Sequence, residues 1–192
     1  IISSNYSELK ILGSRSKQKA EIFATKFSCS DFGSYQDVID SDVDVVYISL
    51  PIGLHEEWSI KAANAGKHVL CEKSSTTSLK SAQNMIDACK QNNVRIMEGF
   101  MFRFHPQHQK VLELVNNARL GKIFSFHGCY GLPPIPYDDI RHNKELGGGV
   151  LNDAACYPIC ASRIVFGAEP ISINCNLDID KKSQVDTKAS IC

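Results

Sequence analysis

The chain has 192 residues, with 21 basic and 21 acidic side chains, 43% hydrophobic residues and 22% charged residues. The balanced charge argues against nucleic acid and anionic membranes as partners, because both select a basic face. The apolar content excludes wholesale disorder, and no window approaches the roughly 20 apolar residues that span a bilayer. Residues 1–10 also lack the form of a signal peptide, so we expect a cytoplasmic protein that acts on a small molecule.

The eight cysteines include no C-x-x-C pair. The chain is long enough to build a core without disulfide staples. Cys156 and Cys160 are four residues apart and share a helix face, where thiols usually serve as small buried hydrophobes. We expect no metal site, because structural zinc prefers closely spaced Cys and His pairs, and the spacings H-x-x-x-H and H-E-x-x-H do not occur.

Strand and helix patterns alternate through the first half of the chain. Predicted strands cover 9–13, 43–50, 68–72 and 94–97, and predicted helices cover 16–27, 54–65 and 79–92. The β-branched run at 43–50 is typical of a parallel strand that is buried on both faces. The alternation predicts an α/β fold with a parallel, doubly wound sheet that binds ligands at the carboxyl ends of its strands.

The second half changes character after Glu98. The pattern predicts a helix over 107–120, a strand over 123–130, a Pro-rich loop at 132–136, a long helix over 150–166 that follows three glycines, and a last strand over 171–179. Proline lacks a backbone N–H, so these prolines fit neither the interior of a helix nor the hydrogen-bonded ladder of a β-sheet. Long irregular connections favour an α+β domain, so we expect one domain over 1–98 and a second over 99–192.

Three side chains are candidates for acid-base chemistry. Lys73 follows a predicted inner strand, where a parallel sheet presents groups to a ligand. Asp153 and Tyr157 are four residues apart in the predicted helix, so both project from one face. A nearby lysine lowers the pKa of a tyrosine from about 10 and lets it act as a general acid or base. The alternatives are a surface lysine in a turn and a core tyrosine after a flexible glycine turn.

Other polar residues are candidates for ligand binding. Ser14 and Arg15 follow the first predicted strand, where a nucleotide fold meets the adenosine ribose. A hydroxyl and a guanidinium suit a 2′-phosphate, so this pair favours NADP, and a plain helix cap is the alternative. His55 lies close to where a cofactor would bind and His142 is a candidate for substrate contact, although a capping or packed role is the alternative for His55.

Several motifs together resemble the Gfo/Idh/MocA family of NAD(P)-dependent oxidoreductases, and in particular its NADP-dependent D-xylose and dihydrodiol dehydrogenases. They are D-V-V-Y-I-S-L-P at 44–51, A-G-K-H-V-L-C-E-K at 65–73, E-G-F-M-F-R-F-H-P at 98–106, E-L-G-G-G-V-L-N-D at 145–153, and Tyr157-Pro158. The resemblance implies a Rossmann domain followed by an α+β domain with an open, mostly antiparallel sheet, which often pairs subunits into a dimer.

The resemblance also implies roles for single residues. Lys73 takes the position of the lysine in the family's Glu-Lys-Pro motif, which contacts the nicotinamide ribose and substrate. Asp153 and Tyr157 match the residues that bind substrate and handle its proton. Further matches to the cofactor cleft are Pro51, His55 and Glu72, and the residues that resemble the lining of the nicotinamide and substrate side are Arg103 and Arg141.

The sequence departs from the family's pattern in two ways. Ser74 replaces the motif's proline, which removes a rigid φ after the lysine. No G-x-G-x-x-G turn occurs, although this turn is the main phosphate site of such folds. Since that turn is expected before Ile1, and Val185-Asp186-Thr187 resembles a point midway through the family's sheet, we expect a fragment that lacks both ends. Such a fragment is expected to bind cofactor poorly and turn over nothing by itself.

We therefore predict an oxidoreductase that transfers hydride between NADP, with NAD possible, and a carbinol carbon of a sugar or cyclic diol. Tyr157 would accept the proton, Lys73 would lower its pKa, and Asp153 would orient the substrate or Tyr157. The alternative is a family-related regulatory or sugar-sensing protein that binds nucleotide without turnover. A thiol- or metal-based module is a third possibility that rests on the cysteine count alone. We expect no nucleic-acid or membrane partner.

Overall fold

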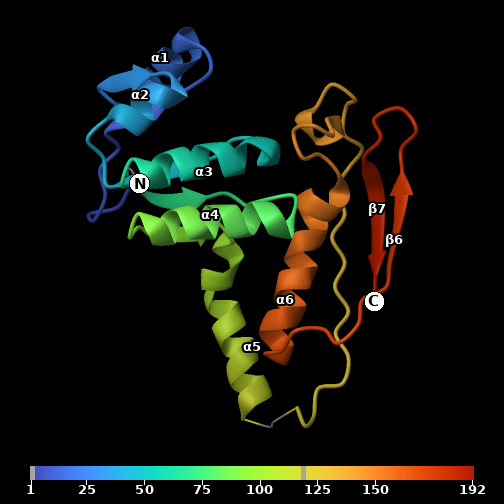
Figure 1. The fold of residues 1–192 in the computed structure, drawn as a ribbon. Coiled ribbons are helices and arrows are strands. Elements are labelled where there is room, and N and C mark those ends of the chain that lie inside the picture. The colour runs from blue at the N-terminus through green and yellow to red at the C-terminus, as the bar shows by residue number, and fades with distance from the viewer. Residues whose placement is uncertain (1–2, 118–119) are drawn as a thin grey trace. The chain divides into compact units, whose positions relative to one another are not determined.

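The computed structural model describes residues 3–117 and 120–192 (Figure 1). The chain forms two compact units. The first comprises Ile1–Ile48, Glu56–Cys71 and Ala82–Met97, and the second comprises Ser49–His55, Glu72–Ser81 and Glu98–Cys192. The segments that follow the second and third predicted strands thus belong to the second unit, and a domain boundary at 98/99 stays a prediction. Among the described residues, none of the helices has the length and apolar character needed to cross a lipid bilayer.

The first unit begins with a parallel strand pair. Strands β1 (Ile11–Gly13) and β2 (Asp31–Gly33) pair in parallel, and helix α1 (Lys17–Lys26) connects them. Ser16 caps α1, since its side chain accepts a hydrogen bond from the amide of Lys19. A capping box starts α2 (Tyr35–Asp40). The sequence predicts β1 and α1, but it missed β2 and α2.

A second parallel arrangement completes the first unit. The strands β3 (Val45–Ile48), β4 (His68–Cys71) and β5 (Ile96–Glu98) form a sheet in this order, with β3 and β4 parallel. The connecting helices are α3 (His55–Asn64) and α4 (Leu79–Gln91). A short 3-10 helix, η1 (Ile52–Leu54), precedes α3 and belongs to the second unit. Ala63, Ala88 and Cys89 form a buried apolar cluster there. The parallel sheets confirm the predicted Rossmann-type half.

The second unit combines helices with an antiparallel hairpin. Its elements are η2 (Met101–Phe104), α5 (Pro106–Asn116), η3 (Ile140–His142), η4 (Leu151–Ala155), α6 (Cys156–Phe166), β6 (Cys175–Ile179) and β7 (Asp186–Ile191). Helix α5 contacts α6, and β6 and β7 form an antiparallel pair in which Cys175 lies opposite Ile191 (Figure 1). This pair confirms the antiparallel sheet that the resemblance implies.

Several predicted elements of this unit are wrong. No strand forms over 123–130, because a strand needs a partner ladder and no described segment pairs with this one. The predicted helix at 107–120 ends at Asn116, and residues 118–119 lie outside the described part of the chain. The long helix opens as a π-helix, η4, before it continues as α6. The last predicted strand is shortened to β6, and β7 was missed.

Candidate active site

The centre of the candidate site is an ion pair in the second unit. Lys73 follows β4, and its Nζ lies 2.8 Å from Oδ1 of Asp153, in η4. The same ammonium donates to the backbone carbonyl oxygen of Asp153 at 2.6 Å. The two side chains are only 16% and 20% exposed, so water screens the pair weakly. The structure therefore brings together two residues that lie 80 positions apart in the sequence.

Arg141 holds the other oxygen of the same carboxylate. Its Nε donates to Oδ2 of Asp153 at 2.8 Å. Nη1 of this guanidinium contacts both carboxylate oxygens of Asp139, at 3.1 and 3.2 Å. The Asp139 side chain also accepts from the backbone amide of Arg141 at the start of η3. Asp153 is thus fixed in orientation between two cations.

These contacts set the protonation of the ion pair. Burial lowers the pKa of Lys73, but the hydrogen bond and negative charge of Asp153 outweigh burial, and the pKa is raised. Burial raises the pKa of Asp153, but Lys73 and then Arg141 outweigh it, and the pKa is lowered. Both residues are therefore held in their charged forms.

Tyr157 lies beside this pair among aromatic rings. Lys73 Nζ lies 5.1 Å from the centre of its ring. Tyr130 stacks on the ring with centroids 5.3 Å apart, and Phe100 and Phe102 meet it edge to face. Burial raises the pKa of the Tyr157 hydroxyl, and Lys73 lowers it by less, so the net pKa is raised. The prediction that Lys73 brings this pKa down is right about the effect of the charge and wrong about the outcome.

The glycine turn and a β-strand hold the helix that carries Asp153. Gly147 and Gly149 have positive φ values of 79° and 114°. The carboxylate of Asp186, at the start of β7, accepts from the backbone amide of Leu151 at 2.5 Å. A carboxylate at a helix N-terminus also interacts favourably with the positive end of the helix dipole. Sequence reasoning missed this role of Asp186, although Val185-Asp186-Thr187 was a visible motif.

His55 occupies the protein interior and not an open cleft. Its exposure is 0%. Its Nδ1 lies 3.0 Å from the carbonyl oxygen of Ser74, and its Nε2 lies 2.7 Å from that of Leu50. Pro51 precedes η1 in the turn that His55 closes. His55 therefore ties two loop segments together, and neither ring nitrogen is left for a cofactor.

The remaining predicted site residues have different surroundings. The Glu72 carboxylate accepts from the amide of Lys73 at 3.3 Å. Arg103 is exposed on η2, and its charge acts on the thiol of Cys160. Ser14 and Arg15 belong to the first unit, where the Ser14 amide donates to the carbonyl of Gly33 at 2.9 Å and Arg15 is exposed. An exposed guanidinium directly after β1 fits a bound phosphate.

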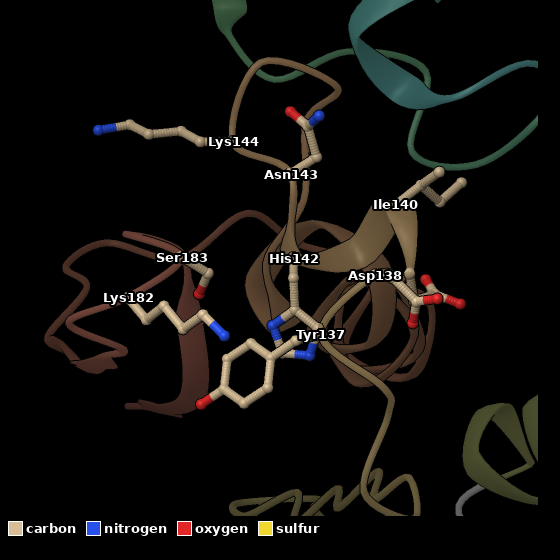
Figure 2. Close-up of a pocket in the computed structure, with 9 residues that line it drawn as sticks. Tyr137, Asp138, Ile140, His142, Asn143, Lys144, Lys182 and Ser183 are labelled. Atoms are coloured by element: carbon tan, nitrogen blue, oxygen red, sulfur yellow. The ribbon is translucent and has the colours of Figure 1, made fainter.

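His142 lines a hollow that its neighbour Arg141 does not line. Its Nε2 lies 3.2 Å from the carbonyl oxygen of Ile135, and its ring lies against Tyr137 with centroids 4.9 Å apart. Figure 2 shows both rings beside Lys182 and Ser183. This hollow has a volume of about 410 Å³. Among the contacts of the described residues, none joins His142 to Lys73, Asp153 or Tyr157.

Comparison with known proteins yields two family matches. Residues 2–100 match an oxidoreductase family with an NAD-binding Rossmann fold, named Gfo/Idh/MocA, and residues 108–192 match the Gfo/Idh/MocA C-terminal domain. The chain is 38% identical over 158 residues to a dTDP-3,4-didehydro-2,6-dideoxy-α-D-glucose 3-reductase of Saccharopolyspora spinosa, a match that covers 82% of this chain and 48% of the reductase. It is 34% identical over 192 residues to D-xylose 1-dehydrogenase (NADP(+)) 2 of Haloferax volcanii, covering 98% of this chain and 58% of that enzyme.

A solved structure gives the same picture. A 3-ketoreductase from Actinomadura kijaniata, in complex with NADP and TDP-benzene, matches 98% of this chain and 58% of its own, with 33% identity and a TM-score of 0.91. Further structures of that enzyme carry a tyrosine-to-phenylalanine or a lysine-to-alanine substitution. The chain spans about half the length of the curated relatives it matches. It belongs to the Gfo/Idh/MocA family of oxidoreductases.

Proposed function

We propose that the complete protein transfers hydride between NADP and a carbon that is a carbonyl in one direction and a carbinol in the other, in a sugar or cyclic diol. The observation that carries this proposal is the contact of Lys73 with both Asp153 and Tyr157. NADPH, when bound, supplies the hydride. In the second unit, Lys73 with the Pro51 and Glu72 turns would hold its nicotinamide half.

Tyr157 is the proposed proton donor in the direction of reduction. Because its pKa is raised, the hydroxyl keeps its proton near neutral pH. The proton passes from this hydroxyl to the substrate oxygen as the carbonyl carbon receives the hydride, and the reverse step returns it to Tyr157. The Lys73 ammonium stabilises the phenolate that remains. Asp153 keeps Lys73 in place, and Arg141 keeps Asp153 in place.

Relatives support these roles. In the Actinomadura 3-ketoreductase, the substituted lysine and tyrosine are separated by the same number of positions as Lys73 and Tyr157. The relatives named above act on a sugar nucleotide and on D-xylose, so a sugar substrate is favoured. A dimer and a cytoplasmic location stay predictions.

Steady-state kinetics of the complete protein test the proposal. NADPH oxidation is measured with a panel of keto sugars, aldoses, inosones and cyclic hydroxyketones, and NADP reduction is measured with the matching alcohols. Tyr157→Phe and Lys73→Met are each expected to lower kcat by about 10²- to 10⁴-fold. Tyr35→Phe and Lys61→Met are the matched controls, because both residues lie in the first unit, where Tyr35 packs on Trp58 and Lys61 pairs with Glu57.

Two results would contradict the proposal. Unchanged kcat in Tyr157→Phe or Lys73→Met would remove that residue from its role. NADP binding without turnover of any compound in the panel would favour a regulatory or sugar-sensing protein.

A further inference from the structure

Ser74 makes a contact that a proline at this position could not make. Its hydroxyl donates to the backbone carbonyl oxygen of Asn152 at 2.7 Å. Lys73, the preceding residue, donates from Nζ to the next carbonyl oxygen, that of Asp153, at 2.6 Å. Consecutive residues of one loop therefore bind consecutive carbonyl groups of η4, the π-helical segment. π-Helical turns often occur at functional sites.

The backbone around Ser74 is fixed separately from its hydroxyl. The Ser74 carbonyl oxygen lies 3.0 Å from Nδ1 of the buried His55. The amide of Ser75 donates to Oε1 of Glu98 at 2.7 Å. These two contacts hold the loop against other parts of the second unit, whereas the hydroxyl links it to η4. Together with the Lys73 ammonium, the hydroxyl thus joins this loop to the segment that bears Asp153.

We propose that Ser74 is a positioning residue, whose hydroxyl holds the Lys73 ammonium against Asp153 and the ring of Tyr157. The inference rests on the proposed function, in which Lys73 stabilises the Tyr157 phenolate. A lysine side chain has four rotatable bonds, so its ammonium stays in place only when the backbone beneath it is fixed. In the family's motif a proline restricts that backbone. In this chain the contacts of His55 and Glu98 hold the backbone of the loop, and the Ser74 hydroxyl adds a hydrogen bond that joins the loop to η4.

The kinetic test compares Ser74→Ala with Ser74→Thr. Ser74→Ala removes the hydroxyl and is expected to lower kcat by about 10-fold to 100-fold with little change in KM, because misplacing a catalytic group mainly affects the reacting step. Ser74→Thr keeps the hydroxyl and is expected to restore most of kcat. Ser162→Ala is the matched control, since the Ser162 hydroxyl also donates to a backbone carbonyl oxygen, that of Ile159 at 2.9 Å, within α6.

A second measurement does not depend on turnover. Competitive acetylation with limiting acetic anhydride, read by mass spectrometry across alkaline pH, reports how well the Lys73 ammonium is held relative to exposed Lys80. Without added cofactor, Lys73 is expected to react several-fold faster in Ser74→Ala than in the wild type, and at the wild-type rate in Ser74→Thr and Ser162→Ala.

The two proposals fail in distinguishable ways. Wild-type kcat and wild-type Lys73 reactivity in Ser74→Ala would overturn the inference and leave the proposed function standing. Equal damage in Ser74→Thr and Ser74→Ala would also overturn it. If the wild type turns over no compound in the panel, the proposed function fails, and the acetylation rates alone decide whether Ser74 positions Lys73.

Discussion

Replacing Asp153 with asparagine removes one negative charge from between two cations and leaves the shape of the side chain unchanged. In the wild type, Oδ1 and Oδ2 accept from Lys73 and Arg141, each at 2.8 Å. Both donors stay charged in the variant, but the amide oxygen can accept from only one of them, so one charge-assisted bond, which contributes about 1.5–3 kcal/mol, is lost and the other is weakened. The asparagine amide also faces one donor with its own N–H groups. We therefore expect Asp153→Asn to lose about 2–3 kcal/mol of unfolding free energy.

Urea and thermal unfolding, followed by circular dichroism at pH 7, measure this loss. In a protein of this size the expected loss corresponds to a midpoint about 4–12 °C lower. Asp178→Asn is the matched control, because Asp178 pairs with Lys188 at 3.7 Å while both side chains are more than 70% exposed. An exposed pair of this kind is worth at most about 1 kcal/mol.

Comparing the two variants tests whether the ion pair of Asp153 stabilises the protein more than an exposed pair does. If Asp153→Asn is no less stable than Asp178→Asn, the low exposure and the double contact of Asp153 do not strengthen its interactions. The reasoning about the ion pair would then be refuted, and with it the physical basis for a fixed Lys73 ammonium.

Lys73 and Arg141 outweigh burial and hold the pKa of Asp153 below the usual value of about 3.9. The stabilisation that the ionised Asp153 provides is therefore present above that pH and is lost as the pH falls through the lowered pKa. The stability difference between the wild type and Asp153→Asn should shrink from about pH 5 to pH 2, and a constant difference would argue against this reasoning. Gly149→Ala should lower the unfolding free energy in urea by roughly 3 kcal/mol or more, because Gly149 has a φ of 114° and the new methyl group would collide with the Asp186 carboxylate. Gly121→Ala, with a φ of 70° and open space around it, should lower it by only about 1–2 kcal/mol. Equal losses in the two variants would contradict this prediction. Ellman's reagent should rapidly modify the three exposed thiols of the native protein, Cys129, Cys175 and Cys192. The three buried thiols, Cys29, Cys71 and Cys89, should react only on unfolding. Rapid reaction of the buried thiols would contradict the described core.

The elements that sequence reasoning located well have strong periodic patterns. The predicted strand at 43–50 contains β3, the predicted helix at 79–92 matches α4, and the strand at 68–72 matches β4. Each lies between glycine, proline or capping residues, so local physics is sufficient to place it. In contrast, β2 and α2 have only three and six residues, which is too short for a period to emerge.

The strand prediction at 123–130 failed for a different reason. The segment alternates apolar and polar residues, but alternation describes a surface that can be half buried and does not provide a partner. Phe124 in this segment is 90% exposed, while Tyr130 at its end stacks on Tyr157. Tyr130 thus contributes to the site, whereas the segment itself pairs with no described strand. Pairing is a property of the tertiary fold, which a local pattern does not encode.

The sequence predicts which residues form the site better than it predicts their pKa values and burial. Lys73, Asp153, Tyr157 and Arg141 are brought together as the motifs imply. The pKa of Tyr157 depends on the balance between burial and the charge of Lys73, and burial is set by rings that lie far away in the sequence. The interior position of His55 likewise depends on two carbonyl groups that belong to separate loops. Both properties require coordinates.

The charges around Tyr157 determine which proton the site can give. Lys73 has a raised pKa and holds its proton more firmly than a free lysine. Asp153 and Asp139 both have lowered pKa values, through Lys73 and Arg141 for the first and mainly through the Arg141 amide for the second, so both are ionised. Compared with Lys73, Asp153 and Asp139, only Tyr157 combines a neutral acid with a neighbouring cation that stabilises its conjugate base. This arrangement supports the proposal that Tyr157 donates a proton to an oxygen that is gaining negative charge, as the reduction of a carbonyl group requires.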